Sequence, residues 1–358
     1  MSKRELSYAA AIKEATEQMM EICPEVYLMG LGVPDPKGIF GTTLGLKEKF
    51  GPKRVLDMPV SENALTGIAI GSALLGLRPI MTHQRADFFF LALDQMVNNA
   101  AKWSFMFGKQ LQVPLVVRLI LGRGWGQGPQ HSQSLHSILA HFPGLKVVMP
   151  SNAYDAKGLL VSSIEDSDPV IFIEHRWLHN IKGEVPQGLY REPIGKAKIL
   201  KEGRDLTIVG CSQMVLEAFK AEKILKELGL SAEIIDLRTI APLDKKTILA
   251  SIKKTGRLLV LDPDWLSYGL SAEIISLAAE EAFRFLKAPP KRMAYPDEPS
   301  PTSWALANYY YPIVEDIVSG SLCLMGKEKE ARVFEEKSLQ KKALAPLDVP
   351  DASFTGPF

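Results

Sequence analysis

The sequence predicts an α/β protein made of two three-layer α/β domains, each built on a mainly parallel sheet. Strand-like and helix-like patterns alternate along both halves of the chain, which is typical of parallel sheets covered by helices. The run Pro114–Leu121 is apolar almost throughout, as expected for a strand buried on both faces. A stretch rich in glycine, proline and charge, Lys182–Asp205, separates the two halves. We therefore expect domains at residues 1–190 and 191–326, followed by a C-terminal extension at residues 327–358.

The composition limits the classes of partner and location. Of the 358 residues, 46% are hydrophobic and 23% are charged, which is ordinary for a soluble globular protein. The formal net charge of +1 gives no electrostatic reason to expect a nucleic acid or an anionic membrane as a partner. No apolar run approaches the roughly 20 residues of a bilayer span, and Met1–Tyr8 has no apolar core of a secretory signal. We expect a cytoplasmic protein in which Cys23, Cys211 and Cys323 are reduced thiols.

The first predicted elements are a helix at Tyr8–Cys23 and a buried strand at Val26–Gly30. A glycine-rich loop follows at residues 30–38. It lacks both the Gly-x-Gly-x-x-Gly context and a Gly-Lys-Ser/Thr ending, so we interpret it as a loop without a phosphate-binding role.

The helix predicted within residues 58–79 carries an acid in its first turn. Ser61 is a suitable N-cap, and Gly76 followed by Pro79 ends the helix. Gly67 and Gly71 lie four residues apart on one face, which predicts that another segment approaches that face closely. The acid is Glu62, and its ordinary role would be a favourable interaction with the helix dipole.

The next segments combine a strand end with polar and aromatic residues. Residues 80–83 are typical of a strand, and the apolar spacing of residues 89–100 predicts a helix packed in the core or at a subunit interface. After the strand at 114–121 comes a loop at residues 122–129, and a helix is expected to open at Gln130. Loops beyond the carboxyl ends of parallel strands are where ligands collect.

Several side chains near this loop are candidates for function. His131 is either an ordinary hydrogen-bonded residue or a group suited to proton transfer, and His136 is interpreted as the ordinary kind. Arg123 and Trp125 are candidates for contact with an anionic substrate or a partner, with plain surface flexibility as the alternative.

The remaining segments continue the alternation. Strands are predicted at residues 146–150, 169–174, 206–211, 232–237 and 258–262, and helices at 155–165, 215–228 and 245–254. No Gly-x-Gly-x-x-Gly follows the strand at 206–211, so a dinucleotide site is not supported.

The chain also carries a series of short blocks whose order and spacing are specific. They are Ser61-Glu62-Asn63, Gly67–Gly71, Gly76–Ile80, Leu93-Asp94-Gln95, Pro129–Ser134, His141–Pro150 and Asp155–Leu160. Together they resemble the β subunit of the thiamine-diphosphate-dependent 2-oxoacid dehydrogenases of the pyruvate and branched-chain type. The resemblance extends to about Val318. It implies a transketolase-like pyrimidine-binding domain followed by a transketolase C-terminal-like domain.

This resemblance implies roles for particular side chains. Glu62 matches the carboxyl group that hydrogen-bonds the cofactor's pyrimidine ring. Phe88 matches the aromatic residue that lies on the aminopyrimidine, with Gln84 as a further cofactor-binding residue. His131 matches the family's active-site histidine, which suits proton transfer or holding a substrate carboxylate. Some family members bind a potassium ion through main-chain oxygens, and the corresponding residues are Leu115, Ser163, Asp166 and Asp168.

The resemblance also implies that the chain holds half of a cofactor site. It has no Gly-Asp-Gly motif, so Mg2+ and the diphosphate of thiamine diphosphate are expected on a separate α subunit in an α2β2 heterotetramer. The implied reaction is oxidative decarboxylation of a small-molecule 2-oxo acid, with acyl transfer to lipoamide on a lipoyl-bearing acyltransferase.

Alternatives to this activity stay open. The run Thr82–Asp87 is more polar than the family pattern, which favours a split transketolase-like or synthase enzyme with a non-lipoyl acceptor. A non-catalytic scaffold of the same fold would only bind partners, although Glu62, Phe88 and His131 are all present. A nicotinamide oxidoreductase is disfavoured because neither half has a phosphate-binding glycine fingerprint.

Overall fold

The computed structural model describes residues 4–123 and 126–349, which form two compact units. The first unit holds residues 4–122 and 138–194, and the second holds residues 123, 126–137 and 195–349. The division lies close to the expected boundary at residue 190, with two differences. The segment at residues 123–137 belongs to the second unit, and the C-terminal extension packs with that unit as far as Val349. In the described part of the chain, no helix has the length and apolar character needed to cross a membrane.

Six strands of the first unit pair in parallel, in the order β6-β7-β5-β4-β2-β3. Their bounds are β2 (Val26–Gly30), β3 (Val55–Leu56), β4 (Arg78–His83), β5 (Val116–Leu121), β6 (Lys146–Val148) and β7 (Val170–His175). Every residue of β5 and β7 is buried, because helices cover both faces of the sheet. The predicted parallel sheet is confirmed.

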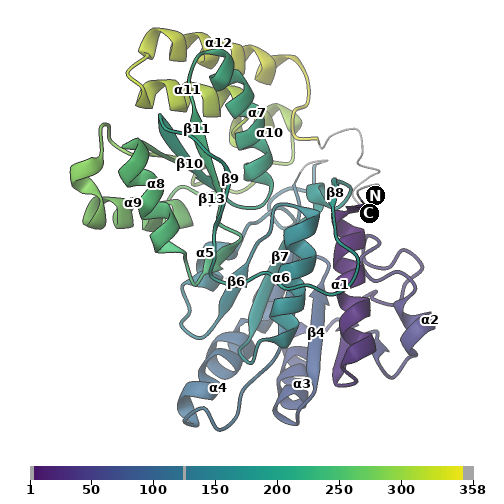
Figure 1. Cartoon of the computed structure of the whole chain (residues 1–358). Coiled ribbons are helices and arrows are strands. Elements are labelled where there is room, and N and C mark those ends of the chain that lie inside the picture. Colours follow the sequence, from purple (N-terminus) through teal and green to yellow (C-terminus); the bar gives the residue numbers. More distant parts are fainter. Residues whose placement is uncertain (1–3, 124–125, 350–358) are drawn as a thin grey trace. The chain divides into compact units, whose positions relative to one another are not determined.

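Helices and short helical turns surround this sheet (Figure 1). They are α1 (Tyr8–Ile22), α2 (Leu46–Phe50), α3 (Glu62–Leu74), η1 (Ala86–Ala92), η2 (Gln95–Ala100), α4 (Ala101–Met106), α5 (His136–Ala140), α6 (Ala153–Glu165) and η3 (Arg176–Leu178). α1 and α6 lie side by side. The single helix predicted at 89–100 is instead a 3-10 helix, a π-helix and a short α-helix in succession.

The helix α3 differs from its prediction in two respects. Ser61 precedes it but makes no side-chain capping hydrogen bond. Among the described residues, no atom comes within 4 Å of a Cβ built on Gly71, and Gln95 comes no closer than an ordinary 3.5 Å to a Cβ built on Gly67, so the close approach predicted at this face is not made by this part of the chain and stays a prediction. The predicted end is confirmed, since Gly76 follows the helix with φ +94°.

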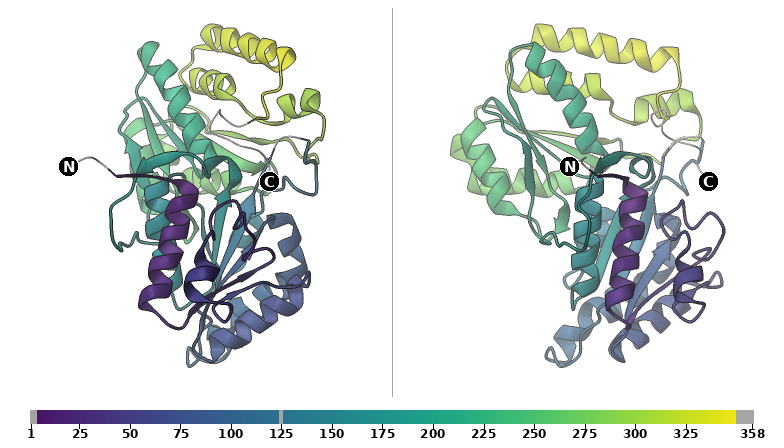
Figure 2. Two further views of the ribbon diagram at one scale, coloured as in Figure 1. Left: turned by 90° about the vertical axis from the view of Figure 1, so that its right-hand side faces the viewer. Right: turned by 45° about the vertical axis from the view of Figure 1, so that its right-hand side comes forward.

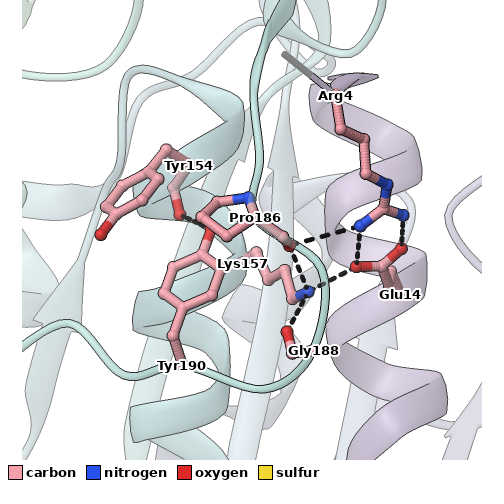
Figure 3. Close-up of polar contacts among 7 residues, drawn as sticks. All are labelled: Arg4, Glu14, Tyr154, Lys157, Pro186, Gly188 and Tyr190. Atoms are coloured by element: carbon pink, nitrogen blue, oxygen red, sulfur yellow. Dashed lines mark hydrogen bonds and ion pairs between the residues drawn. The ribbon is translucent and has the colours of Figure 1, made fainter. Parts of the chain in front are cut away.

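A buried lysine fastens the segment that leaves the first unit (Figure 3). The side chain of Lys157, on α6, is fully buried and donates to the carbonyl of Gly188 at 2.6 Å. It also pairs with Glu14 of α1, which Arg4 contacts as well. Tyr190 adds a hydrogen bond of 2.8 Å to the carbonyl of Tyr154. A two-stranded antiparallel pair, β1 (Glu5–Ser7) with β8 (Lys182–Glu184), holds the same region.

The second unit contains a five-stranded sheet in the order β14-β13-β10-β11-β9. Its strands are β9 (Lys198–Lys201), β10 (Leu206–Gly210), β11 (Ala232–Asp236), β13 (Leu258–Trp265) and β14 (Lys291–Tyr295), and β12 (Thr239–Ala241) is a further short strand. Only β9 runs antiparallel to its neighbour within this sheet. The three strands predicted from apolar runs are β10, β11 and β13, and all are confirmed.

The helices of the second unit are α7 (Gln213–Glu227), α8 (Lys245–Thr255), α9 (Leu270–Glu281), η4 (Phe283–Phe285), α10 (Trp304–Tyr310), α11 (Val314–Leu324) and α12 (Glu328–Leu344). The core is formed by buried aliphatic residues of α7, α11 and the sheet. The C-terminal extension contains α12, which lies along α11 in both views of Figure 2. It is fixed there by ion pairs such as Lys342 with Asp316 at 2.8 Å. The extension is thus an ordered part of this unit as far as Val349.

Candidate functional site

The first unit carries all three predicted cofactor-binding residues. Glu62 is the first residue of α3, and only 9% of it is exposed. Phe88 lies on η1, which packs against α3, and 43% of it is exposed. Gln84 lies between β4 and η1 and donates from Nε2 to the carbonyl of Leu31 at 2.9 Å. A nearly buried carboxyl group and an accessible aromatic face therefore come from neighbouring elements, which suits a planar heterocycle with a basic ring nitrogen.

A buried charged network joins the neighbouring strands β5 and β7. Arg118 of β5 donates from Nε to Glu174 of β7 at 2.7 Å, and both side chains are fully buried. The other oxygen of Glu174 is 3.0 Å from Nε2 of His179. Burial opposes the charge of Glu174, but Arg118 and His179 lower the pKa of its carboxyl group below the ordinary value. Sequence analysis missed this network, although a charged residue inside an otherwise apolar strand was a usable signal.

Two more arginines lie beside this network in the first unit. The guanidinium carbon of Arg176 is 4.4 Å from the ring centroid of Phe40, and that of Arg85 is 5.8 Å from the same centroid. Both arginines are buried. Nearby His83 is also buried, and desolvation lowers its pKa to about 4, so it is neutral at physiological pH. The polar run at residues 82–87 is thus mostly buried, and it contributes Arg85 to a group of buried arginines rather than to a polar surface.

His131 lies in the segment that belongs to the second unit. The helix predicted to open at Gln130 begins only at His136, and residues 130–135 are not helical. The backbone amide of His131 donates to the carbonyl of Gly128 at 3.4 Å. Trp125, proposed with Arg123 as a substrate contact, lies outside the described residues.

His136 holds the end of this segment to the second unit. Its side chain is fully buried, with Nε2 2.9 Å from Oδ1 of Asp262 and Nδ1 3.1 Å from Oγ of Ser134. The other oxygen of Asp262 accepts a bond from the amide of Ser271, at the start of α9. The Oγ of Ser137 accepts a bond of 3.0 Å from the amide of Leu270. His136 therefore has the ordinary hydrogen-bonding role that was predicted, and its hydrogen bonds hold the segment that carries His131.

Arg123 is buried at the start of the same segment. Its guanidinium carbon lies 4.1 Å from the ring centroid of Tyr311, and its Nε is 3.2 Å from Oδ1 of Asp348. Asp348 comes from the C-terminal extension, which Asn308 holds through hydrogen bonds to Lys342, Ala345 and Leu347. Surface flexibility, the alternative considered for Arg123, does not describe this residue.

The predicted potassium-binding residues lie near the end of α6, together with two cationic side chains. Arg78 donates to the carbonyl oxygens of Ile164 and Asp166 at 2.7 and 3.1 Å. Lys146 contacts the carboxylates of Asp166 and Asp168 at 2.7 and 3.1 Å. Among the described residues, no group of three or more His, Cys, Asp or Glu side chains is arranged to hold a metal ion. A potassium ion held by main-chain oxygens at this place would compete with Arg78 for the carbonyl oxygen of Asp166.

Comparison with known proteins assigns the chain to a class of protein with this fold. The chain matches two family models, "Transketolase, pyrimidine binding domain" over residues 4–181 and "Transketolase, C-terminal domain" over residues 195–317. A solved structure described as a split gene transketolase, inactive beta4 tetramer, has a TM-score of 0.73 and covers 90% of this chain and 99% of that one. Its sequence identity is 20%, so it supports the fold alone. The chain is a transketolase-type, two-domain α/β protein, as predicted.

Curated relatives narrow this class. The β-2 subunit of the pyruvate dehydrogenase E1 component of Oryza sativa subsp. japonica is 43% identical over 319 residues, covering 88% of this chain and 85% of the relative. The β subunit of acetoin:2,6-dichlorophenolindophenol oxidoreductase of Bacillus subtilis (strain 168) is 41% identical, covering 90% and 98%. The 2-oxoisovalerate dehydrogenase β subunit of the same strain is 40% identical, covering 88% and 97%. The chain belongs to the family of β subunits of the thiamine-diphosphate-dependent 2-oxoacid dehydrogenase E1 components, and is thus an oxidoreductase subunit, as its sequence blocks predicted.

Proposed function

We propose that this chain works with an α subunit in an α2β2 heterotetramer that decarboxylates a 2-oxo acid oxidatively and passes the acyl group to lipoamide. Bound thiamine diphosphate supplies a carbon acid that, once deprotonated, adds to a carbonyl and accepts the electron pair released with carbon dioxide. The disulfide of lipoamide is the oxidant, and it leaves as an acyl thioester with one free thiol. Mg2+ and the diphosphate would be held by the α subunit, since this chain has no Gly-Asp-Gly motif.

Glu62 carries this proposal. Its nearly buried carboxyl group at the head of α3 supports this role, in which Glu62 would hydrogen-bond a ring nitrogen of the cofactor and share a proton with it. The exposed ring of Phe88 offers a stacking surface worth about 0.5–1.5 kcal/mol beyond area burial, and Gln84 holds the backbone carbonyl of Leu31. We assign His131 to proton transfer or to the substrate carboxylate, since an imidazole exchanges protons near neutral pH.

The first test is calorimetric titration of thiamine diphosphate with MgCl2. The titrant is added to this chain alone, to a candidate α subunit alone, and to their mixture. We expect binding only in the mixture, because each chain supplies half of the site. A mixture that forms a heterotetramer by size-exclusion chromatography and still binds no cofactor would contradict the proposal and leave the scaffold as the better account.

A second candidate function keeps the cofactor but changes the acceptor. The run at residues 82–87 is more polar than the family pattern and carries the buried Arg85, which favours a split transketolase-like or synthase enzyme. The same reconstituted mixture is assayed with lipoamide as the acceptor and, separately, with aldehydes as acceptors. The acceptor that the enzyme uses discriminates between the two candidate functions.

Potassium binding and a cytoplasmic location stay predictions. Potassium dependence of cofactor affinity, measured in sodium against potassium buffers, tests the site at Leu115, Ser163, Asp166 and Asp168. The rice relative is named as mitochondrial and the other two are bacterial, so cell fractionation of the native source tests the location.

A further inference from the structure

The segment that carries His131 is fixed to the second unit at its middle and at its end. At the end, the buried pair of His136 and Asp262 holds it, with Nε2 2.9 Å from Oδ1. In the middle, Gly128 lies against Thr302, since a Cβ built on Gly128 would come within 2.6 Å of Oγ1 of Thr302. The φ of Gly128 is +67°, a left-handed conformation that favours glycine. Contacts within this unit thus set the path of residues 126–137.

The beginning of this segment is set by Arg123, of which only 5% is exposed. Its guanidinium carbon lies 4.1 Å from the ring centroid of Tyr311, which packs edge-on against Tyr295 with 4.9 Å between the centroids. Its Nε is 3.2 Å from Oδ1 of Asp348. A guanidinium stacks well on an aromatic face, but a buried cation is also stabilised by an opposite charge close by. The carboxylate of Asp348 supplies such a charge.

Asp348 is brought to this place by one buried side chain of α10. Only 1% of Asn308 is exposed, and its Nδ2 donates to the carbonyl oxygens of Lys342 and Ala345 at 2.8 and 2.7 Å. Its Oδ1 accepts a hydrogen bond of 2.9 Å from the amide of Leu347. All three backbone groups lie just before Asp348 in the chain, so Asn308 fixes the backbone that presents this carboxylate.

The helix α12, which precedes Asp348, is fixed in turn on α11. The Oγ of Ser338 and the Nζ of Lys342 donate to the carboxylate of Asp316 at 2.6 and 2.8 Å. The match to the C-terminal domain model ends at residue 317, so α12 and Asp348 both lie beyond it. An addition to the domain thus contacts the residue at which the His131 segment begins.

We propose that Asp348 is a positioning residue, through which the C-terminal extension holds Arg123 and keeps the segment that carries His131 in the conformation used in catalysis. This inference rests on the proposed function, which assigns His131 to the active site. Loops open locally at a lower free-energy cost than a whole unit unfolds, so the loss of one buried charge acts first on the segment. Glu62 and Phe88 belong to the first unit, and we expect their part in cofactor binding to be spared.

Hydrogen exchange of the full-length chain, followed by mass spectrometry, is the first test because it needs neither cofactor nor substrate. In Asp348→Asn, we expect the amides of residues 126–135 to exchange about tenfold faster than in the wild type. The matched control is Glu336→Gln on α12, an exposed change of the same charge, which should leave this exchange unchanged. A purely global destabilisation would accelerate the amides of β10 and β13 and leave residues 126–135 unchanged, which would overturn the proposal.

A double variant tests whether Asp348 acts through Arg123. Arg123→Met removes the buried cation and keeps an apolar side chain against Tyr311. In this background, Asp348→Asn should cause no further acceleration within residues 126–135, because residues that act through one contact are not additive. A further acceleration of about tenfold would show that Asp348 acts on the segment by another route and would refute the assignment.

Activity of the reconstituted mixture separates this inference from the proposed function. The rate is measured per bound thiamine diphosphate, with pyruvate or 2-oxoisovalerate, whichever the wild type decarboxylates faster. In Asp348→Asn, we expect kcat/KM to fall about tenfold while the affinity for thiamine diphosphate changes less than about twofold. Normal cofactor binding with a wild-type rate would refute the positioning role and leave the proposed function standing. Exchange that depends on both Asp348 and Arg123, in a mixture that binds no thiamine diphosphate, would refute the proposed function and leave the hold on the segment standing.

Discussion

The Nε2 atom of His136 lies 2.9 Å from Oδ1 of Asp262, and both side chains are fully buried. These residues are 126 positions apart in the chain. The bond ties the end of the segment that carries His131 to β13, and Ser134 accepts or donates at the other ring nitrogen, 3.1 Å away. Because a buried polar contact is rigid, the placement of His131 within the second unit depends on this pair.

The stability that His136 contributes should fall as the pH rises. Burial disfavours the charged imidazolium, but the hydrogen bond to Asp262 and the charges of Asp264 and Asp262 raise the pKa of His136 above its ordinary value. A folded-state pKa above the unfolded one gives stability that is complete below about pH 6.5 and is lost as the pH rises through the raised value. We expect His136→Gln to cost about 3 kcal/mol below pH 6 and less at pH 8, as measured by urea unfolding.

The control for this prediction is His141→Gln, at an exposed position in the first unit. Burial also raises the pKa of Asp264, so the stability that this carboxyl group contributes likewise falls as the pH rises, in a lower pH range than for His136. A free-energy loss in His136→Gln that stays constant between pH 5.5 and 8.5 would show that the imidazole does not titrate in this range and would contradict the prediction.

The C-terminal extension should stabilise the second unit through Asp348. Its carboxylate is 3.2 Å from Nε of Arg123, and the exposed fractions of the two side chains are 8% and 6%. We expect Asp348→Asn to lower the free energy of unfolding by about 1–3 kcal/mol, because the buried guanidinium loses a charged partner. Glu336→Gln, an exposed change of the same charge on α12, should have no measurable effect. Equal midpoints for the two variants in chemical unfolding would argue against a role for this ion pair.

Lys157 should be the main support of the segment that leaves the first unit (Figure 3). Lys157→Met keeps the length of the side chain, but it leaves the carbonyl of Gly188 without this donor and the carboxylate of Glu14 with Arg4 as its remaining cationic partner. The expected loss is about 3 kcal/mol, with faster limited proteolysis within residues 185–194. Lys182→Met, an exposed change in the same region, serves as the control. Unchanged proteolysis in Lys157→Met would mean that the β1–β8 pair alone holds the segment.

The sequence predicted the strands better than the contacts between them. The strands that were predicted are short apolar runs flanked by turn residues, and such a local pattern can be recognised from the sequence alone. They are β2, β5, β7, β10, β11 and β13. The helix α12 was not predicted, because its buried face consists of Ala331, Ser338 and Lys342 and its docking depends on ion pairs with α11. The residues at 86–100 were ambiguous, since consecutive phenylalanines fit several helical periods.

The site was predictable only where a resemblance named its residues. Glu62 and Phe88 were proposed from their match to the family and lie on packed elements of one unit, and their roles in cofactor binding stay predictions. The contacts of His136, Arg176 and Arg123 join residues far apart in sequence, and no periodicity reports such pairs. A charged residue in an apolar strand, as with Arg118, is the one local signal that pointed toward this buried network.

Glu62→Gln should separate cofactor binding from proton removal. Glutamine keeps the size of the side chain and can still contact a ring nitrogen, so thiamine diphosphate affinity in the reconstituted mixture should change less than tenfold. It cannot hold the proton that a carboxyl group shares with the pyrimidine, and loss of general acid–base assistance typically costs about 10²–10⁴ in rate. We expect deuterium exchange at the thiazolium C2 carbon, followed by NMR after acid quench, to slow by at least 100-fold. Glu48→Gln, an exposed acid in α2, should exchange at the normal rate, and a normal rate in Glu62→Gln as well would remove Glu62 from the proposed proton transfer.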